Sequence, residues 1–367
     1  MSVLIAGGGT GGHVFPMIAV GQAVQSVAPE AEVFYVGTAR GIETRAIPAA
    51  GGELELVDVA PLRGGGVGGF ARGAVQAVRG LLQSRRLIER RRPDVVFSVG
   101  GYAGGPIALA ARMAGVPLAI LEPNAVLGLT NRLLSPLAAR AYTAFGDLHR
   151  AFRSDVGLKT GVPLRRSIES SAYEAEAGRF SILVLGGSQG AKALNERVPA
   201  AFAALVREIP HARIVHQAGK GRGEETRAAY EQAGAPEWSR RVVEFIDDVG
   251  GELRAADVVV QRCGASSLAE LCATGRASVL VPFPFAADQH QLQNAKSLER
   301  AGAAVALALA VATAARLGTE LLPPARDAGR GKRVAGAAPA AGEPDAARAV
   351  AEDLLRLAGR PQGTRRS

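Results

Sequence analysis

Residues 3–13 read VLIAGGGTGGH, a short apolar run that leads directly into a glycine-rich turn. Residues 182–190 read ILVLGGSQG and repeat that arrangement in the second half of the chain. Both turns open helix-like stretches, and strand, tight turn and helix in succession are typical of a phosphate-binding turn. Glycine suits such a turn because it tolerates positive φ and lets backbone N–H groups approach an anion. The sequence therefore predicts two nucleotide-type folds in one chain and a ligand that carries phosphate.

The composition is that of a globular protein large enough for two domains. The chain has 367 residues, of which 48% are hydrophobic and 21% are charged, so wholesale disorder is excluded. Cys263 and Cys272 are the only cysteines, and their spacing does not suit a metal site. We expect two structural thiols and, with no signal peptide evident, a reducing cytoplasm. The longest apolar candidate for a membrane span, residues 301–315, is shorter than the roughly 20 residues that a bilayer requires.

Short β-rich runs alternate with alanine-rich helical stretches along both halves. This alternation predicts parallel sheets with helices on both faces, which is an α/β fold with two doubly wound, Rossmann-like domains. The loop around residues 160–163 marks the boundary. Residues 323–345 are expected to form a loop, and residues 344–357 a final helix. The expected strands are residues 3–6, 33–36, 54–59, 94–99, 117–121, 140–145, 181–185, 213–217, 242–246, 257–260 and 278–282.

Two familiar nucleotide-binding classes fit poorly. Gly7, Gly9 and Gly12 have the spacing of a dinucleotide-binding turn, but the second strand ends in Gly37-Thr38 instead of the acid that binds a ribose. No Gly-Lys-Ser/Thr follows any glycine turn, so a P-loop is excluded.

The net charge of +9 is concentrated in one segment. Between Phe70 and Arg92 lie seven arginines and a single acid, Glu89, interleaved with apolar residues at helical spacing. The segment is predicted to form a basic amphipathic helix. Its arginines form either a solvated face above a packed apolar stripe or a surface that docks on an anionic membrane. Nucleic acid is a weaker candidate partner because aromatics make up only 5% of the chain.

Several further segments, read in order, carry a specific resemblance. Together they resemble the MurG family of bacterial cell-wall glycosyltransferases over about residues 3–303. The segments are residues 8–16 (GGTGGHVFP), 100–106 (GGYAGGP), 122–125 (EPNA), 128–131 (GLTN), 161–165 (GVPLR), 186–191 (GGSQGA), 216–219 (HQAG), 262–265 (RCGA), 281–284 (VPFP) and 288–291 (DQHQ).

The resemblance implies a GT-B fold, in which two Rossmann-like domains face each other across a cleft. Residues 1–160 would bind the lipid-linked acceptor and the membrane, and residues 161–340 the UDP-sugar. Residues 341–367 would form a helix that packs back on the first domain, and a tail. The implied reaction is inverting transfer of N-acetylglucosamine from UDP to the muramoyl 4-hydroxyl of lipid I, which gives lipid II in peptidoglycan synthesis. The implied location is the cytoplasmic face of the membrane, with cell-wall synthesis proteins as partners.

His13 is the candidate catalytic base. It ends the first glycine turn, where a helix dipole would disfavour the imidazolium form of the ring and so keep it able to accept a proton. A histidine at this place could equally cap the helix or contact a diphosphate, and both interpretations stay open.

The resemblance also assigns binding residues. The charged clamp on the donor diphosphate would be Arg165, the ribose ligand Glu270, and the sugar contact Gln291 with His290 beside it. The full donor set is Thr10, Gly11, Gly12, Asn124, Arg165, Ser188, Gln189, Gly190, Ile246, Glu270, His290 and Gln291. The acceptor set is Gly8, Gly9, Gly101, Tyr102 and Gly104.

No cofactor or bound metal is expected, because no Asp-x-Asp or other metal-ligand pattern occurs. Val162, Cys263 and Gln289 depart from the family's usual residues without removing a group that the chemistry needs. Three alternatives remain: a related GT-B enzyme acting on another lipid or natural product, a UDP-sugar epimerase of the same fold, and a basic membrane-surface scaffold without catalytic activity.

Overall fold

The computed structural model divides the chain into two compact units. Unit 1 comprises Met1–Arg165 and Asp345–Ser367, and unit 2 comprises Arg166–Pro344. The structure describes residues 1–59, 66–145, 147–165, 167–168, 171, 173–174, 176, 178–187, 190–286, 289–327, 333–334, 336–337, 343 and 345–359. The side chains of residues 66–75, 77 and 102 lie outside this description.

Unit 1 is built on a parallel sheet of seven strands among the described residues, in the order β3-β2-β1-β4-β5-β6-β7. The order reverses between β1 and β4, which lie side by side although β2 and β3 come between them in sequence. The strands are β1 (Ser2–Ala6), β2 (Glu32–Gly37), β3 (Glu53–Leu56), β4 (Val95–Ser98), β5 (Leu118–Glu122), β6 (Arg140–Thr143) and β7 (Gly157–Lys159).

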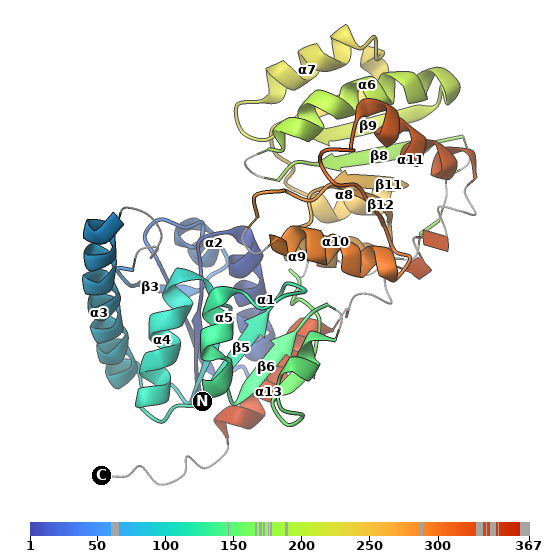
Figure 1. Ribbon diagram of the computed structural model, residues 1–367. Helices are drawn as coiled ribbons and strands as arrows, with labels where there is room; N and C mark the ends of the chain where they lie inside the picture. Colours follow the sequence, from blue (N-terminus) through green and yellow to red (C-terminus); the bar gives the residue numbers. More distant parts are fainter. Residues whose placement is uncertain are drawn as a thin grey trace. The chain divides into compact units, whose positions relative to one another are not determined.

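Helices cover both faces of this sheet, and successive strand residues alternate between two cores. Val3 and Ile5 pack with α1 (Gly11–Val27), α2 (Glu43–Ala49) and α13 (Ala346–Ala358). Leu4 and Ala6 face the opposite side and pack with α3 (Gly66–Arg91), α4 (Gly101–Met113) and α5 (Leu129–Leu134). Figure 1 shows α3, α4 and α5 side by side on this second face.

Unit 2 repeats the plan with the strand order β10-β9-β8-β11-β12-β13. One core of this unit joins β8, β9 and β11 to the helices α6, α7 and α11. The strands are β8 (Phe180–Leu185), β9 (Ala212–Gln217), β10 (Arg240–Val243), β11 (Val258–Gln261), β12 (Ala277–Leu280) and β13 (Val305–Ala306). The helices are α6 (Lys192–Glu208), α7 (Gly223–Gln232), α8 (Val249–Ala255), α9 (Ala265–Thr274), α10 (His290–Arg300) and α11 (Ala314–Arg326). The predicted class of two doubly wound parallel sheets is confirmed.

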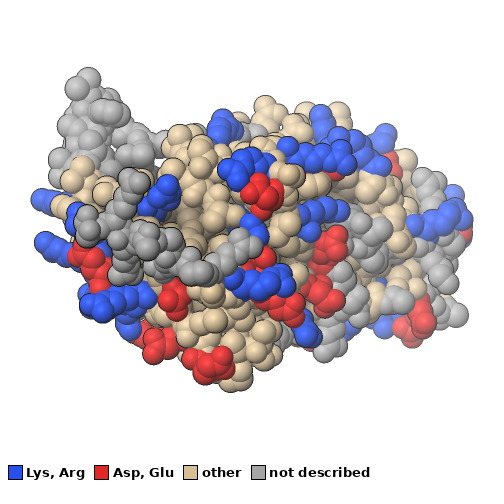
Figure 2. All heavy atoms as spheres, turned by 90° about the horizontal axis from the view of Figure 1, so that it is seen from below, with Lys and Arg blue, Asp and Glu red and all other residues tan. Residues whose placement is uncertain are grey.

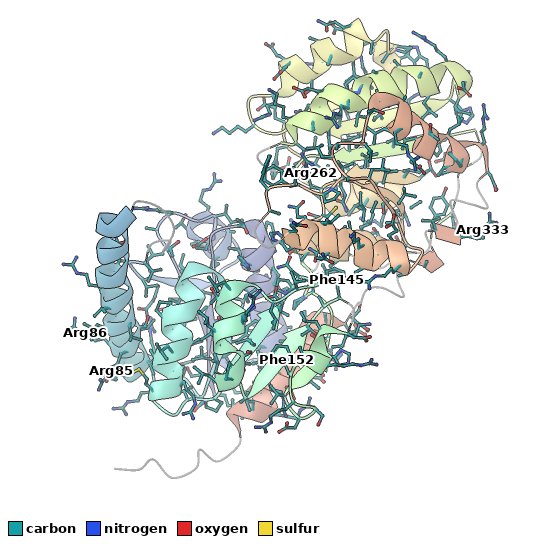
Figure 3. The ribbon with its side chains drawn as sticks, in the orientation of Figure 1. Arg85, Arg86, Phe145, Phe152, Arg262 and Arg333 are labelled. Atoms are coloured by element: carbon teal, nitrogen blue, oxygen red, sulfur yellow. The ribbon has the colours of Figure 1, made fainter. Side chains whose placement is uncertain are left out.

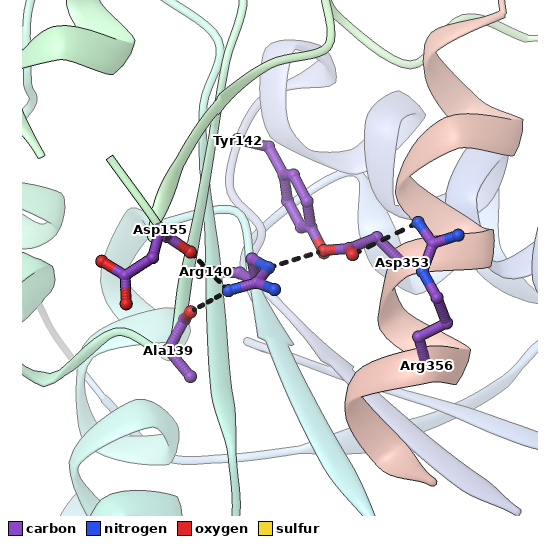
Figure 4. Close-up of polar contacts among 6 residues, drawn as sticks. All are labelled: Ala139, Arg140, Tyr142, Asp155, Asp353 and Arg356. Carbon is purple, nitrogen blue, oxygen red and sulfur yellow. Dashed lines mark hydrogen bonds and ion pairs between the residues drawn. The ribbon is translucent and has the colours of Figure 1, made fainter. Parts of the chain in front are cut away.

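The C-terminal helix α13 belongs to unit 1, although unit 2 precedes it in the chain. Asp353 anchors it: its carboxylate accepts hydrogen bonds from Arg140 Nε at 3.0 Å and from the Tyr142 hydroxyl at 3.0 Å, both on β6 (Figure 4). Arg356 on the same helix adds a bond of 3.3 Å to the other carboxylate oxygen. Burial raises the pKa of Tyr142 well above its usual value, and the Asp353 charge raises it further.

Two short edge strands and one helix were not predicted. Strands β7 and β13 have three and two residues, too few to show the alternation on which strand prediction depends. Helix α11 continues to Arg326, past Pro323 and Pro324, where a loop was expected from residue 323. Its Leu317 and Leu321 are fully buried, so packing overrides the weak local signal. Among the described residues, no helix is both long and apolar enough to span a bilayer.

Candidate functional site

In unit 1 two glycine turns meet at the carboxyl edge of the sheet. The first follows β1, with Gly8 at φ 141° and Gly9 at φ 94°, and the second follows β4, with Gly101 at φ 74°. A Cβ on Gly101 would stand only 3.0 Å from the Gly8 carbonyl oxygen, so the turns are in direct contact. They lie where the strand order reverses, the place at which open parallel sheets bind ligands.

His13 lies at this meeting point. It is the third residue of α1, and its backbone N–H donates to the Thr10 carbonyl at 3.1 Å. Its Nδ1 lies 3.7 Å from the position of a Cβ on Gly101, so the imidazole packs against the second turn. The structure thus brings His13, the candidate base, together with Gly8 and Gly101, two of the residues predicted to bind the acceptor. Thr10, Gly11 and Gly12 form the start of the same helix.

Two other residues predicted to bind the acceptor, Tyr102 and Gly104, lie on α4. Gly104 lies inside α4, where a Cβ would come within 2.6 Å of the Ser98 hydroxyl oxygen on β4. Its lack of a side chain therefore allows α4 to pack on the sheet. The backbone of Tyr102 is in the first turn of α4.

Glu122 is a site residue that sequence reasoning missed. It is buried at the end of β5, and one carboxylate oxygen accepts from the Asn124 backbone N–H at 3.1 Å and from its side-chain amide at 3.0 Å. The other oxygen accepts from Gly128 N–H at 2.8 Å and from the Asn131 amide at 3.0 Å. Glu122 therefore orients Asn124, the predicted donor contact. An acid at the end of a buried strand was the signal available in the sequence.

Arg165 ends the first of the two segments that make up unit 1. Its guanidinium carbon lies 4.4 Å from the ring centroid of Phe15, two residues beyond His13 on α1, in cation–π contact. The charged group predicted to hold the donor diphosphate thus lies next to the helix that carries the candidate base.

In unit 2 the third glycine turn follows β8, again where the strand order reverses. Gly186 N–H donates to the Gln217 carbonyl at 3.2 Å, and a Cβ on Gly190 would overlap the Ala218 carbonyl oxygen. The turn is therefore pressed against the loop that follows β9. Ser188 and Gln189, predicted to bind the donor, lie outside the described residues.

A buried hydrogen-bonded chain supports that loop. The Asn195 amide donates to the Ala218 carbonyl at 2.9 Å, which leaves its Oδ1 to accept from His216 Nε2 at 3.1 Å. His216 Nδ1 then accepts from the Tyr230 hydroxyl at 2.9 Å. Because a carbonyl only accepts, every donor in the chain is fixed and His216 carries its proton on Nε2. Burial lowers the pKa of His216 to about 3, which keeps the ring neutral.

The remaining donor residues lie around the ends of β10, β11 and β12. Gln291 Oε1 accepts from the backbone N–H of Cys263 at 3.2 Å and from that of Phe283 at 2.9 Å, so it ties α10 to the loops after β11 and β12. Glu270 is 7% exposed on α9, and Ile246 is buried beyond β10. His290 is the first residue of α10.

Arg262 joins the loop after β11 to the loop after β12. Arg262 donates to the carbonyls of Val281 at 3.1 Å and Pro282 at 3.3 Å. Cys263 and Cys272 are buried, and burial raises the pKa of both thiols, that of Cys272 to about 12. Within the part of the chain that the structure describes, no group of three or more His, Cys, Asp or Glu could hold a metal ion.

Comparison with known proteins places both units in one family. Residues 3–143 match the model of the glycosyltransferase family 28 N-terminal domain, and residues 181–349 match that of its C-terminal domain. A protein of Sorangium cellulosum, described as UDP-N-acetylglucosamine–N-acetylmuramyl-(pentapeptide) pyrophosphoryl-undecaprenol N-acetylglucosamine transferase, is 55% identical over 99% of this chain and 90% of its own.

Solved structures agree with the sequence match. The crystal structure of Acinetobacter baumannii MurG is 30% identical, with a TM-score of 0.79 over 97% of this chain and 99% of that one. A UDP-N-acetylglucosamine 2-epimerase has a TM-score of 0.69 over 100% and 99% of the two chains, at 14% identity. That second likeness is evidence of the fold alone.

Proposed function

The chain belongs to glycosyltransferase family 28, and we propose that it transfers N-acetylglucosamine from UDP-N-acetylglucosamine to the muramoyl 4-hydroxyl of lipid I. The product is lipid II, the membrane-bound precursor of peptidoglycan. The observation that carries this proposal is the near full-length match to a relative described as that transferase. The first and third glycine turns each lie where the strand order of their sheet reverses, and this placement of the motif residues supports the proposal.

On the acceptor side, His13 is the proposed general base. Inverting displacement needs a group that removes the proton from the attacking hydroxyl as the new bond forms. The imidazole lies between the first and second glycine turns, which supports this role. Contact with a phosphate of either substrate is the competing role for the same ring, and the two differ in what a His13 variant loses.

On the donor side, we propose that Arg165 and the third glycine turn stabilise the departing diphosphate without a required metal ion. Glu270 would accept hydrogen bonds from the ribose hydroxyls, and Gln291 would contact the transferred sugar. Since its Oε1 is used by Cys263 and Phe283, Gln291 would reach the sugar through its amide N–H groups.

The donor assignment predicts weaker UDP binding in two variants. Glu270→Ala and Arg165→Ala should each lose about 1 to 3 kcal/mol of binding free energy, because each removes a charged hydrogen-bonding group. Titration calorimetry with UDP measures this directly. Unchanged affinity in both variants would reject the assignment.

We also propose that unit 1 docks on the anionic surface of the membrane. Val78 on α3 is 59% exposed, Leu82 is 52% exposed and Met113 on the adjacent α4 is 60% exposed, a set that offers apolar groups to the interface. Arg79, Arg86 and Arg112 are exposed on the same two helices. Figure 3 shows Arg86 pointing outward from α3. This combination is typical of a helix face that binds anionic lipid.

The transfer reaction is tested with radiolabelled UDP-N-acetylglucosamine and a short-chain lipid I analogue. Label should move into the lipid product only when the acceptor is present. Consumption of the donor without acceptor would instead indicate an epimerase, and label transfer to a different acceptor would indicate a related glycosyltransferase. Absence of UDP binding would favour a non-catalytic scaffold.

A further inference from the structure

Glu43, the first residue of α2, binds the backbone of the first glycine turn through its carboxylate. The side chain is fully buried. One carboxylate oxygen accepts from Gly9 N–H at 2.9 Å, and the other accepts from the N–H of Thr38 at 2.9 Å and from its hydroxyl at 3.0 Å. The carboxylate therefore joins the turn after β1 to the turn after β2.

Glycines surround the Glu43 carboxylate and let it lie close to the backbone. A Cβ on Gly8 or on Gly41 would overlap its carboxylate oxygens. Among the described residues, no Lys, Arg or His forms an ion pair with Glu43. Gly9 N–H and the N–H and hydroxyl of Thr38 are neutral donors, so two turns supply the hydrogen bonds that an anion needs on burial.

This arrangement changes what the first turn can bind. In a phosphate-binding turn the N–H groups point to the ligand, but here Gly9 N–H is already donated to a protein carboxylate. In a dinucleotide-binding fold an acid at the end of the second strand reaches out to a ribose. Here Thr38, which directly follows that strand, donates its N–H and its hydroxyl to the buried Glu43 carboxylate.

We propose that Glu43 is a positioning residue that serves as the internal anion of the first glycine turn. It fixes Gly8 and Gly9, and through their contact with Gly101 it fixes the place of His13. The acceptor phosphates then bind to groups other than Gly9 N–H, which Glu43 already occupies. The effect on catalysis rests on the proposed function, whereas the effect on the turn does not.

The first test compares Glu43→Gln with a matched control. The amide keeps the size of the side chain but turns an N–H donor toward Gly9 or Thr38, whose backbone N–H groups are also donors. The expected result is a fall of about 10- to 100-fold in kcat/KM for the lipid acceptor, with KM for UDP-N-acetylglucosamine within about twofold of wild type. Asp94 is the control, since its carboxylate accepts Ser2 N–H at 2.9 Å at the opposite end of the same sheet. Asp94→Asn should lower the melting temperature without changing kcat/KM for the lipid acceptor or KM for UDP-N-acetylglucosamine.

The second test is chemical rescue of Glu43→Ala. Formate should enter the vacated space and restore transfer by about tenfold or more, while chloride at equal ionic strength should not. Hydrogen exchange of the Gly9 amide should be faster in Glu43→Ala and slower again with formate, whether or not transfer occurs. Failure of the wild type to transfer sugar would sink the proposed function and leave this exchange test valid. Equal loss of donor and acceptor parameters, or absence of any formate effect on both readouts, would overturn the role of Glu43.

Discussion

His13 is the residue on which the proposed chemistry depends. Its imidazole contacts the second glycine turn of unit 1. His13→Ala should lower turnover by about 10² to 10⁴-fold if the ring is the base, with UDP affinity unchanged. Steady-state kinetics and calorimetry measure the two quantities separately. A loss of UDP affinity with turnover retained would mean that His13 contacts phosphate instead.

The buried, neutral ring of His216 should make the free energy of unfolding depend on pH. Its pKa is about 3 in the folded protein and about 6.5 when unfolded, so the unfolded state binds more protons between these values. The stabilisation from the neutral ring is complete above about pH 6.5 and is lost as the pH falls toward 3. The slope reaches at most about 1.4 kcal/mol per pH unit. Urea unfolding between pH 4 and 7 should show a flatter profile for His216→Gln. The exposed His211 provides the control, and His211→Gln should keep the wild-type slope.

At the scale of the element, α3 shows what the sequence could and could not decide. Its amphipathic pattern predicted a helix from Phe70, and the structure has it from Gly66 to Arg91. The pattern could not show that Arg90 and Arg91 bind Glu55 and Glu53 of β3, because those partners are distant in sequence. Arg85 likewise pairs with Glu89 on the helix itself. Figure 2 shows acidic side chains beside the basic ones along this edge of unit 1.

The site divides in a similar way. His13, Gly8 and Gly101 could be placed together because each belongs to a turn that follows a predicted strand. Glu43 could not, since a carboxylate that binds backbone N–H groups leaves no spacing rule in the sequence. Glu122 offered only its place at the end of a buried strand, and its four hydrogen bonds could not be predicted from that. The resemblance named Gln291 as a sugar contact, but it could not show that the side-chain oxygen of Gln291 accepts from two backbone N–H groups.

Because Arg85, Arg90 and Arg91 form ion pairs, the membrane prediction is best tested at other exposed arginines of unit 1. Replacing Arg79, Arg86 and Arg112 with glutamine should reduce binding to anionic vesicles at low salt, whereas the same change at Arg207, Arg227 and Arg300 of unit 2 should not. Wild-type binding should weaken with salt, because the Debye length falls from about 10 Å at 0.1 M to about 3 Å at 1 M. Vesicle sedimentation gives the bound fraction. Equal binding to neutral and anionic vesicles would contradict the electrostatic contribution and leave Val78, Leu82 and Met113 as the anchor.

At the scale of the whole molecule, the chain passes from unit 1 to unit 2 and returns. The return is secured by α13, whose Val350 and Leu354 enter the same core as Val20 and Val24 of α1. Asp353→Ala would remove this core's link to Arg140 and leave that guanidinium, 16% exposed, without its carboxylate partner, although it would keep its bonds to the Ala139 and Asp155 carbonyls. Unit 1 should lose about 2 to 4 kcal/mol of unfolding free energy.

Segment-resolved hydrogen exchange distinguishes this effect from general damage. Peptides from β6 and α1 should exchange faster in Asp353→Ala, and peptides from β8 and β9 should not change. Glu352→Ala is the matched control, because its pair with Arg348 is exposed and contributes little. Uniform acceleration in both units would argue against a local role for α13.

The same return path has a consequence during translation. The ribosome makes β1 to β7 first, then all of unit 2, and only then the helix that completes the first core. Until α13 emerges, the nascent first unit leaves apolar side chains of α1 uncovered, and such surfaces are prone to aggregate or to recruit chaperones. A circular permutant that begins with residues 345–359 would supply the helix early, so its yield without chaperones should exceed that of the natural order.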